Sequence, residues 1–425
     1  GGGAGGGAGE AAPQHEVPLS ADDAPSSGSA VPKPLLALLR HVPEQLGREG
    51  LSQSVAEKLS RLLSCLKPGE MDPDLPELLD LATLRQLCAE GIPDEVPALR
   101  AVLWKVLLGY LPVNVTRWTS AISRPRNAHR GFVAELLSAL RGEERDEAEE
   151  EEEGCEVRQV LRLIAKDVAR TRPELDFFAQ RLQGGGGGGD QEPEAPRRSC
   201  EHEVQVADIE RPQYHHDVLA RILLLYARLN PGVGYVQGMN EICAPIYYLF
   251  AQDPLCDAAD AEADAFFCFS LVLAEMRDAF VQDCNHTEAG MIGRMRHIDE
   301  VLRDYDPKVW AHLDNNGVPP MLYTARWVTS MLAQDLEMPE VLRLWDALLG
   351  DLSGPQPLLH FYCAARVIAI RKPLLFSDEV ECLRLLQRGG YPEVAAEDAL
   401  NLAISLQSAC QGGLCAASGI ASAAA

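Results

Sequence analysis

Apolar residues recur along most of the chain at the three- and four-residue spacing of helices. In residues 97–109 they form one continuous stripe, with proline in the first turn and glycine just after the last apolar position. Residues 215–230 repeat this pattern and stop at an Asn-Pro-Gly turn. Sustained alternation of apolar and polar residues, which marks strands, does not occur. The pattern predicts an all-α fold.

Composition predicts how the chain is organised. Residues 1–30 are rich in Gly and Ala and contain few apolar anchors, which is typical of a disordered tail. Residues 31–80 predict short amphipathic helices followed by a linker, and residues 81–408 predict one multi-helix domain. The final residues, 409–425, are again small and predict a second disordered tail.

Two low-complexity insertions interrupt the predicted domain. The first, 143–156, contains ten acidic residues and one arginine, which is typical of a solvated, disordered loop. The second, 184–200, begins with a run of glycines that follows no predicted strand and opens no predicted helix. We therefore interpret it as a linker rather than as a dinucleotide-binding loop.

The charge and the cysteines argue against several classes of function. The chain has 425 residues and a net charge of −25, which disfavours nucleic acid and anionic membranes as direct partners. Its 12 cysteines show no Cys-x-x-Cys spacing, so no metal site is predicted. No apolar run reaches the length of a membrane span. We expect a reduced, cytoplasmic protein that does not insert into membranes and, without a visible oligomerisation signal, a monomer.

Motifs of enzymes that act alone on nucleotides or acyl groups are missing from the sequence. There is no Gly-x-x-x-x-Gly-Lys-Ser/Thr phosphate loop, no Gly-x-Ser-x-Gly nucleophile turn and no His-Glu-x-x-His zinc motif. A self-contained hydrolase or kinase is therefore not expected. Any chemistry on a nucleotide would require another protein to bring that nucleotide.

Two short segments carry the candidate chemistry. In the first, Arg170 follows Asp167 by three residues, so the carboxylate can steer the guanidinium. In the second, Gln237 lies between Gly234 and Gly238, where the backbone can approach a ligand closely. Arginine and glutamine are the side chains that GTP hydrolysis needs. On spacing alone, however, the first pair favours a surface ion pair worth less than about 1 kcal/mol, and Gln237 could be a hydrogen bonder at a helix start.

Three motifs occur in order along the chain, namely Arg100-x-x-x-Trp104, Ile164-x-x-Asp167-x-x-Arg170 and Tyr235-x-Gln237-Gly238-Met239-Asn240. Two downstream segments, Arg326-Trp327 and Arg343-Leu344-Trp345-Asp346, complete the pattern. The chain thereby resembles TBC domains, a helical family of GTPase-activating proteins for Rab GTPases, from about residue 81 to about residue 408. Leu229–Gly232 and Phe266–Phe269 resemble one member of the family in particular.

The resemblance implies a role for each residue of the second and third motifs. Arg170 would be an arginine finger that stabilises charge at the γ-phosphate, and Gln237 would be a glutamine finger that orients the attacking water. Asp167 would orient the Arg170 guanidinium, and Tyr235 would pack against the switch region of the GTPase. An arginine finger supplied in trans is worth about 10³–10⁵ in rate, or roughly 4–7 kcal/mol of barrier.

The remaining motif residues are expected to support these fingers. Arg100 and Trp104 would shape the floor of the site and brace the N-terminal helices, although their spacing alone favours a structural stacking pair. Ile164, Gly238 and Asn240 complete the motifs as supporting residues.

The resemblance also implies the partner. It would be a Rab-family GTPase in its GTP-bound state that carries GTP and Mg²⁺, so the chain needs no cofactor and has no stand-alone activity. Any membrane association would come through the Rab, in membrane trafficking. The alternative is a non-catalytic Rab-binding scaffold. The acidic run at 143–156 departs from the family pattern, and near the mouth of the site it would repel the triphosphate or tune the choice of Rab.

Overall fold

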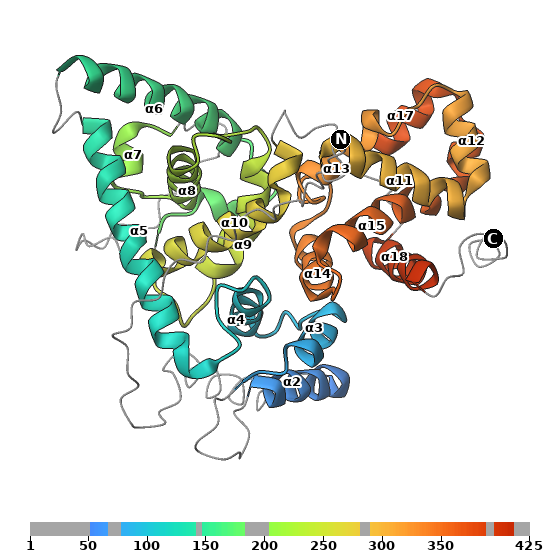
Figure 1. Ribbon diagram of the computed structural model, residues 1–425, viewed down its shortest axis with the longest axis horizontal. Coiled ribbons are helices and arrows are strands. Elements are labelled where there is room, and N and C mark those ends of the chain that lie inside the picture. Colours follow the sequence, from blue (N-terminus) through green and yellow to red (C-terminus); the bar gives the residue numbers. More distant parts are fainter. Residues whose placement is uncertain are drawn as a thin grey trace, which may run out of the picture. The chain divides into compact units, whose positions relative to one another are not determined.

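The computed structural model describes residues 52–66, 78–141, 147–182, 204–280, 290–387 and 395–411, all of which belong to one compact unit, Val31–Ala425. Within these residues every regular element is a helix, and backbone pairing of the strand type is limited to two isolated bridges (Figure 1). The predicted all-α fold is confirmed.

Helices make up most of the described residues. Their bounds are α2 Gln53–Leu66, α3 Leu81–Ala89, α4 Pro97–Leu107, α5 Trp118–Arg141, α6 Glu147–Val168, α7 Val206–Glu210, α8 His215–Leu229, α9 Met239–Ala251, α10 Ala258–Phe280, α11 Met291–Tyr305, α12 Pro307–Asn315, α13 Met321–Thr329, α14 Met338–Gly350, α15 Pro355–Ala369, α16 Arg371–Leu375, α17 Glu379–Gln387 and α18 Ala396–Gln411. Two 3₁₀ turns, Val115–Arg117 and Asp176–Ala179, complete the described elements.

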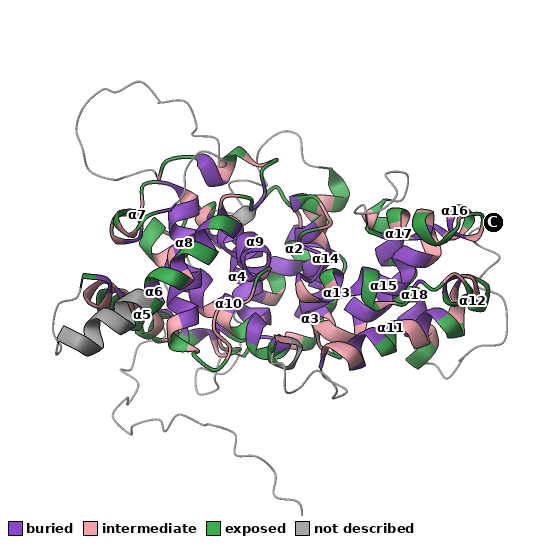
Figure 2. Ribbon diagram, turned by 90° about the horizontal axis from the view of Figure 1, so that it is seen from above, coloured by how far each residue is buried: buried purple, intermediate pink, exposed green. Residues whose placement is uncertain are grey.

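Helices α8 and α9 form the centre of the first half of the domain. Both are apolar around most of their circumference, which is the pattern of a helix enclosed by others. Helix α8 contacts α6, α9 and α10, and α9 also contacts α4. Figure 2 shows buried residues along α8 and α9, as it does along α14 and α15. The segment that joins α8 to α9 carries Gln237, so this core holds one candidate finger in place.

The second half of the domain is organised around α15, which contacts α11, α14 and α18. Helix α14 connects the two halves, because it also contacts α3, α4 and α9. Among the described helices, none combines the length and the apolar character that a bilayer span requires.

The expectation of a disordered loop at 143–156 is wrong for residues 147–156, which form the first turns of α6. Glutamate and alanine are good helix formers, and carboxylates are stabilised near the N-terminus of a helix by its dipole. At about 1.5 Å per residue, Glu156 lies roughly 20 Å along the chain direction from Arg170. This exceeds the screening length of about 8 Å at physiological ionic strength, so the described acids do not crowd the candidate site.

Several expected segments fall wholly or partly outside the described residues. The tail at 1–30 and the Gly-rich insertion at 184–200 lie outside them, as do residues 143–146. In the region 31–80 one amphipathic helix is observed, α2, while residues 31–51 and 67–77 are not described. Helix α18 continues to Gln411, three residues into the expected C-terminal tail.

Candidate functional site

Arg170 lies in the turn that follows α6, which ends at Val168. Its Nη2 donates to Asp167 Oδ1 at 2.9 Å, and its Nε donates to the carbonyl of Lys166 at 3.1 Å. The side chain of Arg170 is nevertheless 70% exposed. The guanidinium is therefore oriented by two bonds to its own turn while much of its surface faces solvent.

Asp167 connects this turn to the segment that carries Gln237. The side chain of Asp167 is buried, and its second oxygen accepts a hydrogen bond from the Tyr235 hydroxyl at 2.8 Å. Burial, and then the hydrogen bond to Asp167, raise the pKa of Tyr235 far above its ordinary value, so the phenol remains a donor at neutral pH. One carboxylate thus binds Arg170 on one oxygen and Tyr235 on the other.

The glutamine loop, residues 230–238, joins α8 to α9. Gly234 and Gly238 adopt positive φ angles of 66° and 99°, a conformation that glycine adopts at little cost. Gly238 immediately precedes the first residue of α9. Gln237 is exposed, and its side chain has no hydrogen-bond partner within the described parts of the chain. The loop therefore presents an uncommitted amide two residues from Tyr235.

Asn240 forms a second link between the two segments. This buried side chain lies in the first turn of α9, and its Nδ2 donates to Thr171 Oγ1 at 2.9 Å and to Glu241 Oε1 at 3.0 Å. Thr171 Oγ1 donates in turn to the carbonyl of Asp167 at 3.0 Å. The structure thus brings together Asp167, Arg170, Tyr235 and Asn240 in one hydrogen-bond network.

Sequence reasoning missed Arg172, a buried residue two positions after Arg170. Its φ of 50° is unusual for a non-glycine residue. Its guanidinium donates to the carbonyl of Leu336 at 2.7 Å and to the carbonyl of Ala333, and its Nε lies 3.8 Å from Glu241 Oε2. Arg172 therefore fixes the turn after α6 against the segment before α14. These two segments are far apart in the sequence, so no local spacing predicts the contact.

Glu241 is also a new member of this region. Burial raises the pKa of its carboxyl to about 7; Arg172 opposes the shift, and Glu174 adds to it. Near neutral pH the residue therefore changes charge beside the network that holds Arg170.

Arg100 and Trp104 belong to a separate, fully buried cluster around Asp346 of α14. Arg100 Nη2 donates to Asp346 Oδ2 at 3.1 Å, and Trp104 Nε1 donates to Oδ1 at 2.7 Å. The backbone N–H of Ile92 donates to Oδ2 at 2.8 Å, and Arg100 also binds Asp94. These bonds join α4 to α14, while the role of Arg100 and Trp104 in shaping the floor of the site stays a prediction.

No described hydrogen bond or ion pair joins this Asp346 cluster to Arg170 or Gln237. Ile164 is fully buried in the hydrophobic core, so it supports α6 by packing. The structure thus divides the sequence motifs between a polar network at the candidate site and buried structural contacts elsewhere.

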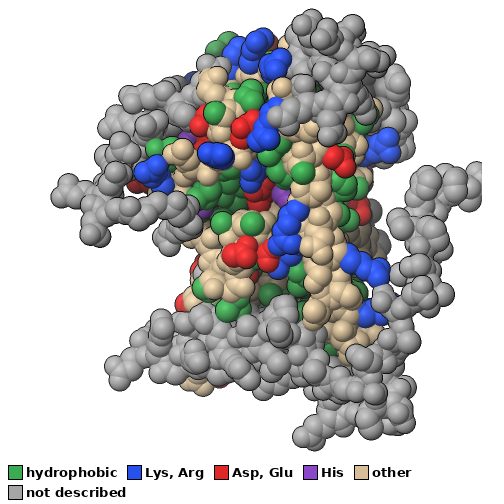
Figure 3. Space-filling model, turned by 90° about the vertical axis from the view of Figure 1, so that its left-hand side faces the viewer, with side chains coloured by type: hydrophobic (Ala, Val, Ile, Leu, Met, Phe, Trp, Pro, Cys, Tyr) green, Lys and Arg blue, Asp and Glu red, His purple; other side chains and the backbone are tan. Residues whose placement is uncertain are grey.

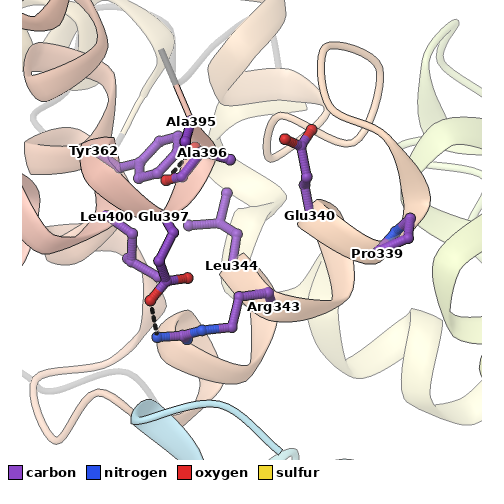
Figure 4. A pocket seen from close by; sticks show the side chains of 9 residues that line it. All are labelled: Pro339, Glu340, Arg343, Leu344, Tyr362, Ala395, Ala396, Glu397 and Leu400. Atoms are coloured by element: carbon purple, nitrogen blue, oxygen red, sulfur yellow. Dashed lines mark hydrogen bonds and ion pairs between the residues drawn. The ribbon is translucent and has the colours of Figure 1, made fainter. Parts of the chain in front are cut away.

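Two pockets of the described residues offer little catalytic chemistry. A pocket of about 270 Å³ lies between α14 and α18 (Figure 4). There Arg343 donates to Glu397 Oε1 at 2.9 Å and to the carbonyl of Ala89 at 3.1 Å, so its guanidinium ties helices together. A second pocket, of about 340 Å³, lies against residues 230–233 of the glutamine loop and is lined by Arg277 as its one charged residue. Over the described ranges no group of three metal-ligating side chains occurs.

Comparison with known proteins identifies similar sequences over most of the chain. The family model described as the Rab-GTPase-TBC domain matches residues 197–375, a range that includes Gln237 and begins after Arg170. TBC1 domain family member 13 from Mus musculus is 32% identical over 362 residues, which cover 72% of this chain and 89% of that protein. This match confirms the expected resemblance to one family member. The GTPase-activating protein gyp1 from Schizosaccharomyces pombe is 26% identical over 343 residues, covering 77% of this chain and 57% of that protein.

Comparison with solved structures gives the same fold. The crystal structure of the Ypt/Rab-GAP domain of Gyp1p superposes with a TM-score of 0.63 at 22% identity, covering 84% of this chain and 99% of that chain. At this identity the likeness supports the fold alone.

Proposed function

The chain belongs to the Rab-GTPase-TBC domain family of GTPase activators, and from this premise we propose that it accelerates GTP hydrolysis on a Rab partner with two side chains supplied in trans. Arg170 is the arginine finger and Gln237 is the glutamine finger. The observation that carries the proposal is the combination of exposure and anchoring: Arg170 is 70% exposed and is held by Asp167, whose other oxygen binds Tyr235 in the glutamine loop.

The electrostatic step follows from the geometry of Arg170. Charge spreads over the oxygens of the transferred phosphoryl group in the transition state, and a guanidinium placed there stabilises that charge. Because Asp167 already orients Arg170, less conformational entropy is lost when the finger meets the phosphate. This contribution is worth about 10³–10⁵ in rate.

The role of Gln237 follows from its side-chain amide, which has no hydrogen-bond partner among the described residues. An amide offers a donor and an acceptor, which can hold a water molecule in line with the phosphate. Gly234 and Gly238 place the backbone of the loop in a conformation that leaves this side chain exposed. The chain acts as a monomer, and GTP and Mg²⁺ arrive with the partner, so the chain needs no cofactor of its own. The reaction takes place in the cytoplasm or on the membrane to which the Rab is attached.

Single-turnover GTP hydrolysis on a panel of purified, GTP-loaded Rab proteins tests the proposal. We expect the wild-type chain to accelerate at least one Rab, and Arg170→Ala to reduce that acceleration by about 10³-fold or more. Gln237→Ala should also reduce it strongly. Arg384→Ala is the matched control, because Arg384 also forms an exposed i, i+3 pair, with Glu381 on α17, and it should behave as wild type.

Two outcomes contradict the catalytic proposal. One is a wild-type chain that accelerates no Rab; if it still binds a GTP-loaded Rab, the chain is a non-catalytic scaffold. The other is an Arg170→Ala variant as fast as wild type, which would remove the finger assignment.

A further inference from the structure

Helix α6 has two faces of different character. Its buried face packs toward α5, α8 and α9 and is formed by Val157, Leu161, Ile164, Ala165 and Val168. At about 100° per residue, Gln159, Arg162, Leu163 and Lys166 fall within one arc of about 100° on the opposite side. All four are exposed. We call Arg162, Leu163 and Lys166 the basic face of α6.

The two cations of the basic face, Arg162 and Lys166, are not paired with other side chains within the described structure. The side chains of Arg162 and Lys166 form no hydrogen bond or ion pair with any residue that the structure describes, whereas the neighbouring Arg158 donates to the carbonyl of Leu140. Leu163, which lies between them, is 57% exposed. Figure 3 shows Lys and Arg side chains at the upper edge of this side of the molecule, the height at which α6 runs in Figure 1. Two unpaired cations around an exposed leucine are notable in a chain of net charge −25.

The basic face leads directly to the proposed finger. Arg162 and Lys166 lie four residues apart, which places them on one side of α6. Arg170 follows in the turn after the helix, and its Nε donates to the carbonyl of Lys166. At about 1.5 Å per residue the stripe extends roughly 12 Å back from Arg170. A GTPase whose bound GTP lies at Arg170 therefore contacts the basic face with the part of its own surface that lies next to the nucleotide.

We propose that the basic face of α6 is a docking surface for an acidic, partly apolar patch of the GTP-bound GTPase. This inference rests on the proposed function, since it places the GTPase against Arg170. Opposite charges at the edge of an interface speed association and make it sensitive to salt, while Leu163 adds apolar contact that salt does not screen. An anionic lipid surface fits less well, because a membrane extends past the basic face and would also meet the acidic residues 147–156 farther along the same helix, whereas a local patch beside Arg170 would not.

The experiment measures stimulated hydrolysis as a function of GTPase and salt concentration. We expect Arg162→Gln with Lys166→Gln, which removes both charges without placing a carboxylate four residues before Arg170, to raise KM by several fold and to leave kcat within about twofold of wild type. The wild-type kcat/KM should fall as salt rises, and the double variant should show a weaker dependence. Leu163→Ala should raise KM by a few fold without changing the salt dependence.

The matched control neutralises two exposed cations elsewhere, Arg61 on α2 and Lys308 on α12. The Arg61→Gln, Lys308→Gln variant has the same net charge as the α6 double variant and should retain the wild-type KM. If both double variants raise KM equally, net charge is responsible, and the docking surface is wrong.

Binding of GTPase loaded with a non-hydrolysable GTP analogue separates this inference from the proposed function. If wild type binds but does not accelerate hydrolysis, the catalytic proposal fails, and weaker binding by the α6 double variant still supports docking. If Arg170→Ala abolishes acceleration while the α6 double variant binds and works as wild type, catalysis stands and the docking surface is overturned. Co-sedimentation with phosphatidylserine vesicles that depends on Arg162 and Lys166 would also overturn it, in favour of a lipid surface.

Discussion

Two arginine–aspartate pairs in this molecule have opposite surroundings. Arg100 and Asp346 come from α4 and α14, and both side chains are almost completely buried. Arg170 and Asp167 come from one turn, and the arginine is 70% exposed while the aspartate is buried. The same two residue types therefore form a structural contact in one place and a candidate functional group in the other.

The two arginines differ in how many of their guanidinium donors already have a hydrogen-bond partner in the protein. The buried guanidinium of Arg100 binds Asp346, the carbonyl of Ile92 and the exposed Asp94, so its donors already have partners within the protein. Arg170 donates from Nε and Nη2 to its own turn, and no other residue that the structure describes binds its remaining donors, which can meet a phosphate. A buried pair of this kind supports the fold, whereas a half-anchored exposed arginine is suited to a ligand that arrives from outside.

The largest expected effect is on the free energy of unfolding, which should depend much more on the Arg100–Asp346 pair than on the Arg170–Asp167 pair. Asp346→Ala leaves the buried Arg100 charge without its main partner, so the free energy of unfolding should fall by about 3–5 kcal/mol. Urea denaturation measures this loss. Arg170→Ala removes an exposed side chain and leaves the buried Asp167 bonded to Tyr235, so its loss should be smaller, about 1 kcal/mol. Asp304→Ala removes an exposed group and should change the free energy of unfolding by less than about 0.5 kcal/mol. Equal losses for Asp346→Ala and Arg170→Ala would refute the contrast.

The next effect concerns the anchoring of the finger. Asp167→Asn keeps the size of the side chain but removes the charge that binds Arg170, so stimulated kcat should fall by about 10- to 100-fold. Single-turnover kinetics at saturating GTPase measures the change. Glu381→Gln, which removes the charge from the Arg384 pair, should have no effect on the rate. An Asp167→Asn variant with wild-type kcat would show that Arg170 needs no anchor.

A third effect is the pH dependence that Glu241 adds beside the finger. Its folded-state pKa, about 7, lies above the ordinary value of 4.5, so the folded protein holds this proton longer than the unfolded chain. The free energy of unfolding should therefore fall as pH rises from about 4.5 to 7, by at most about 1.4 kcal/mol per pH unit. Urea denaturation across this range should show a smaller slope for Glu241→Gln. Parallel curves for the two proteins would contradict the shift.

The smallest effect tests the link between the two candidate fingers. Tyr235→Phe removes the hydrogen bond to Asp167 and should lower stimulated kcat by about 2- to 10-fold, the worth of one hydrogen bond. Tyr305→Phe is the control, since Tyr305 donates to the carbonyl of Leu406 in the second half of the domain. If both variants reduce kcat equally, the Tyr235 bond has no special role.

Much of the fold could be predicted because helices are local. The apolar spacing in 97–109 and 215–230 predicted α4 and α8 to within about two residues at either end. The acidic run was wrongly predicted to be a loop because its charge suggested a solvated segment. Its glutamates and alanine favour a helix, and they extend the helix that the packed residues Val157–Val168 already form. The charge of these residues predicts that their side chains face solvent, but it does not predict whether their backbone is helical or irregular.

The candidate site was predictable in part. The pairing of Arg170 with Asp167 spans three residues and follows from the geometry of one turn. The bond from Tyr235 to Asp167 spans 68 residues, and the bonds of Asp346 to Arg100 span 246. Arg172 and Glu241 were missed for the same reason, since their contacts depend on the packing of α9 and of the segment before α14.

Short-range information in the sequence was sufficient for the helices, for the two glycines of the glutamine loop and for the arginine that can be steered by its neighbour, because each depends on residues within a turn or two. Tertiary structure decided which arginine is enclosed and which is presented to solvent. Burial depends on what distant segments bring to the same place, and that in turn sets whether a charge is satisfied inside the protein or remains available to a partner.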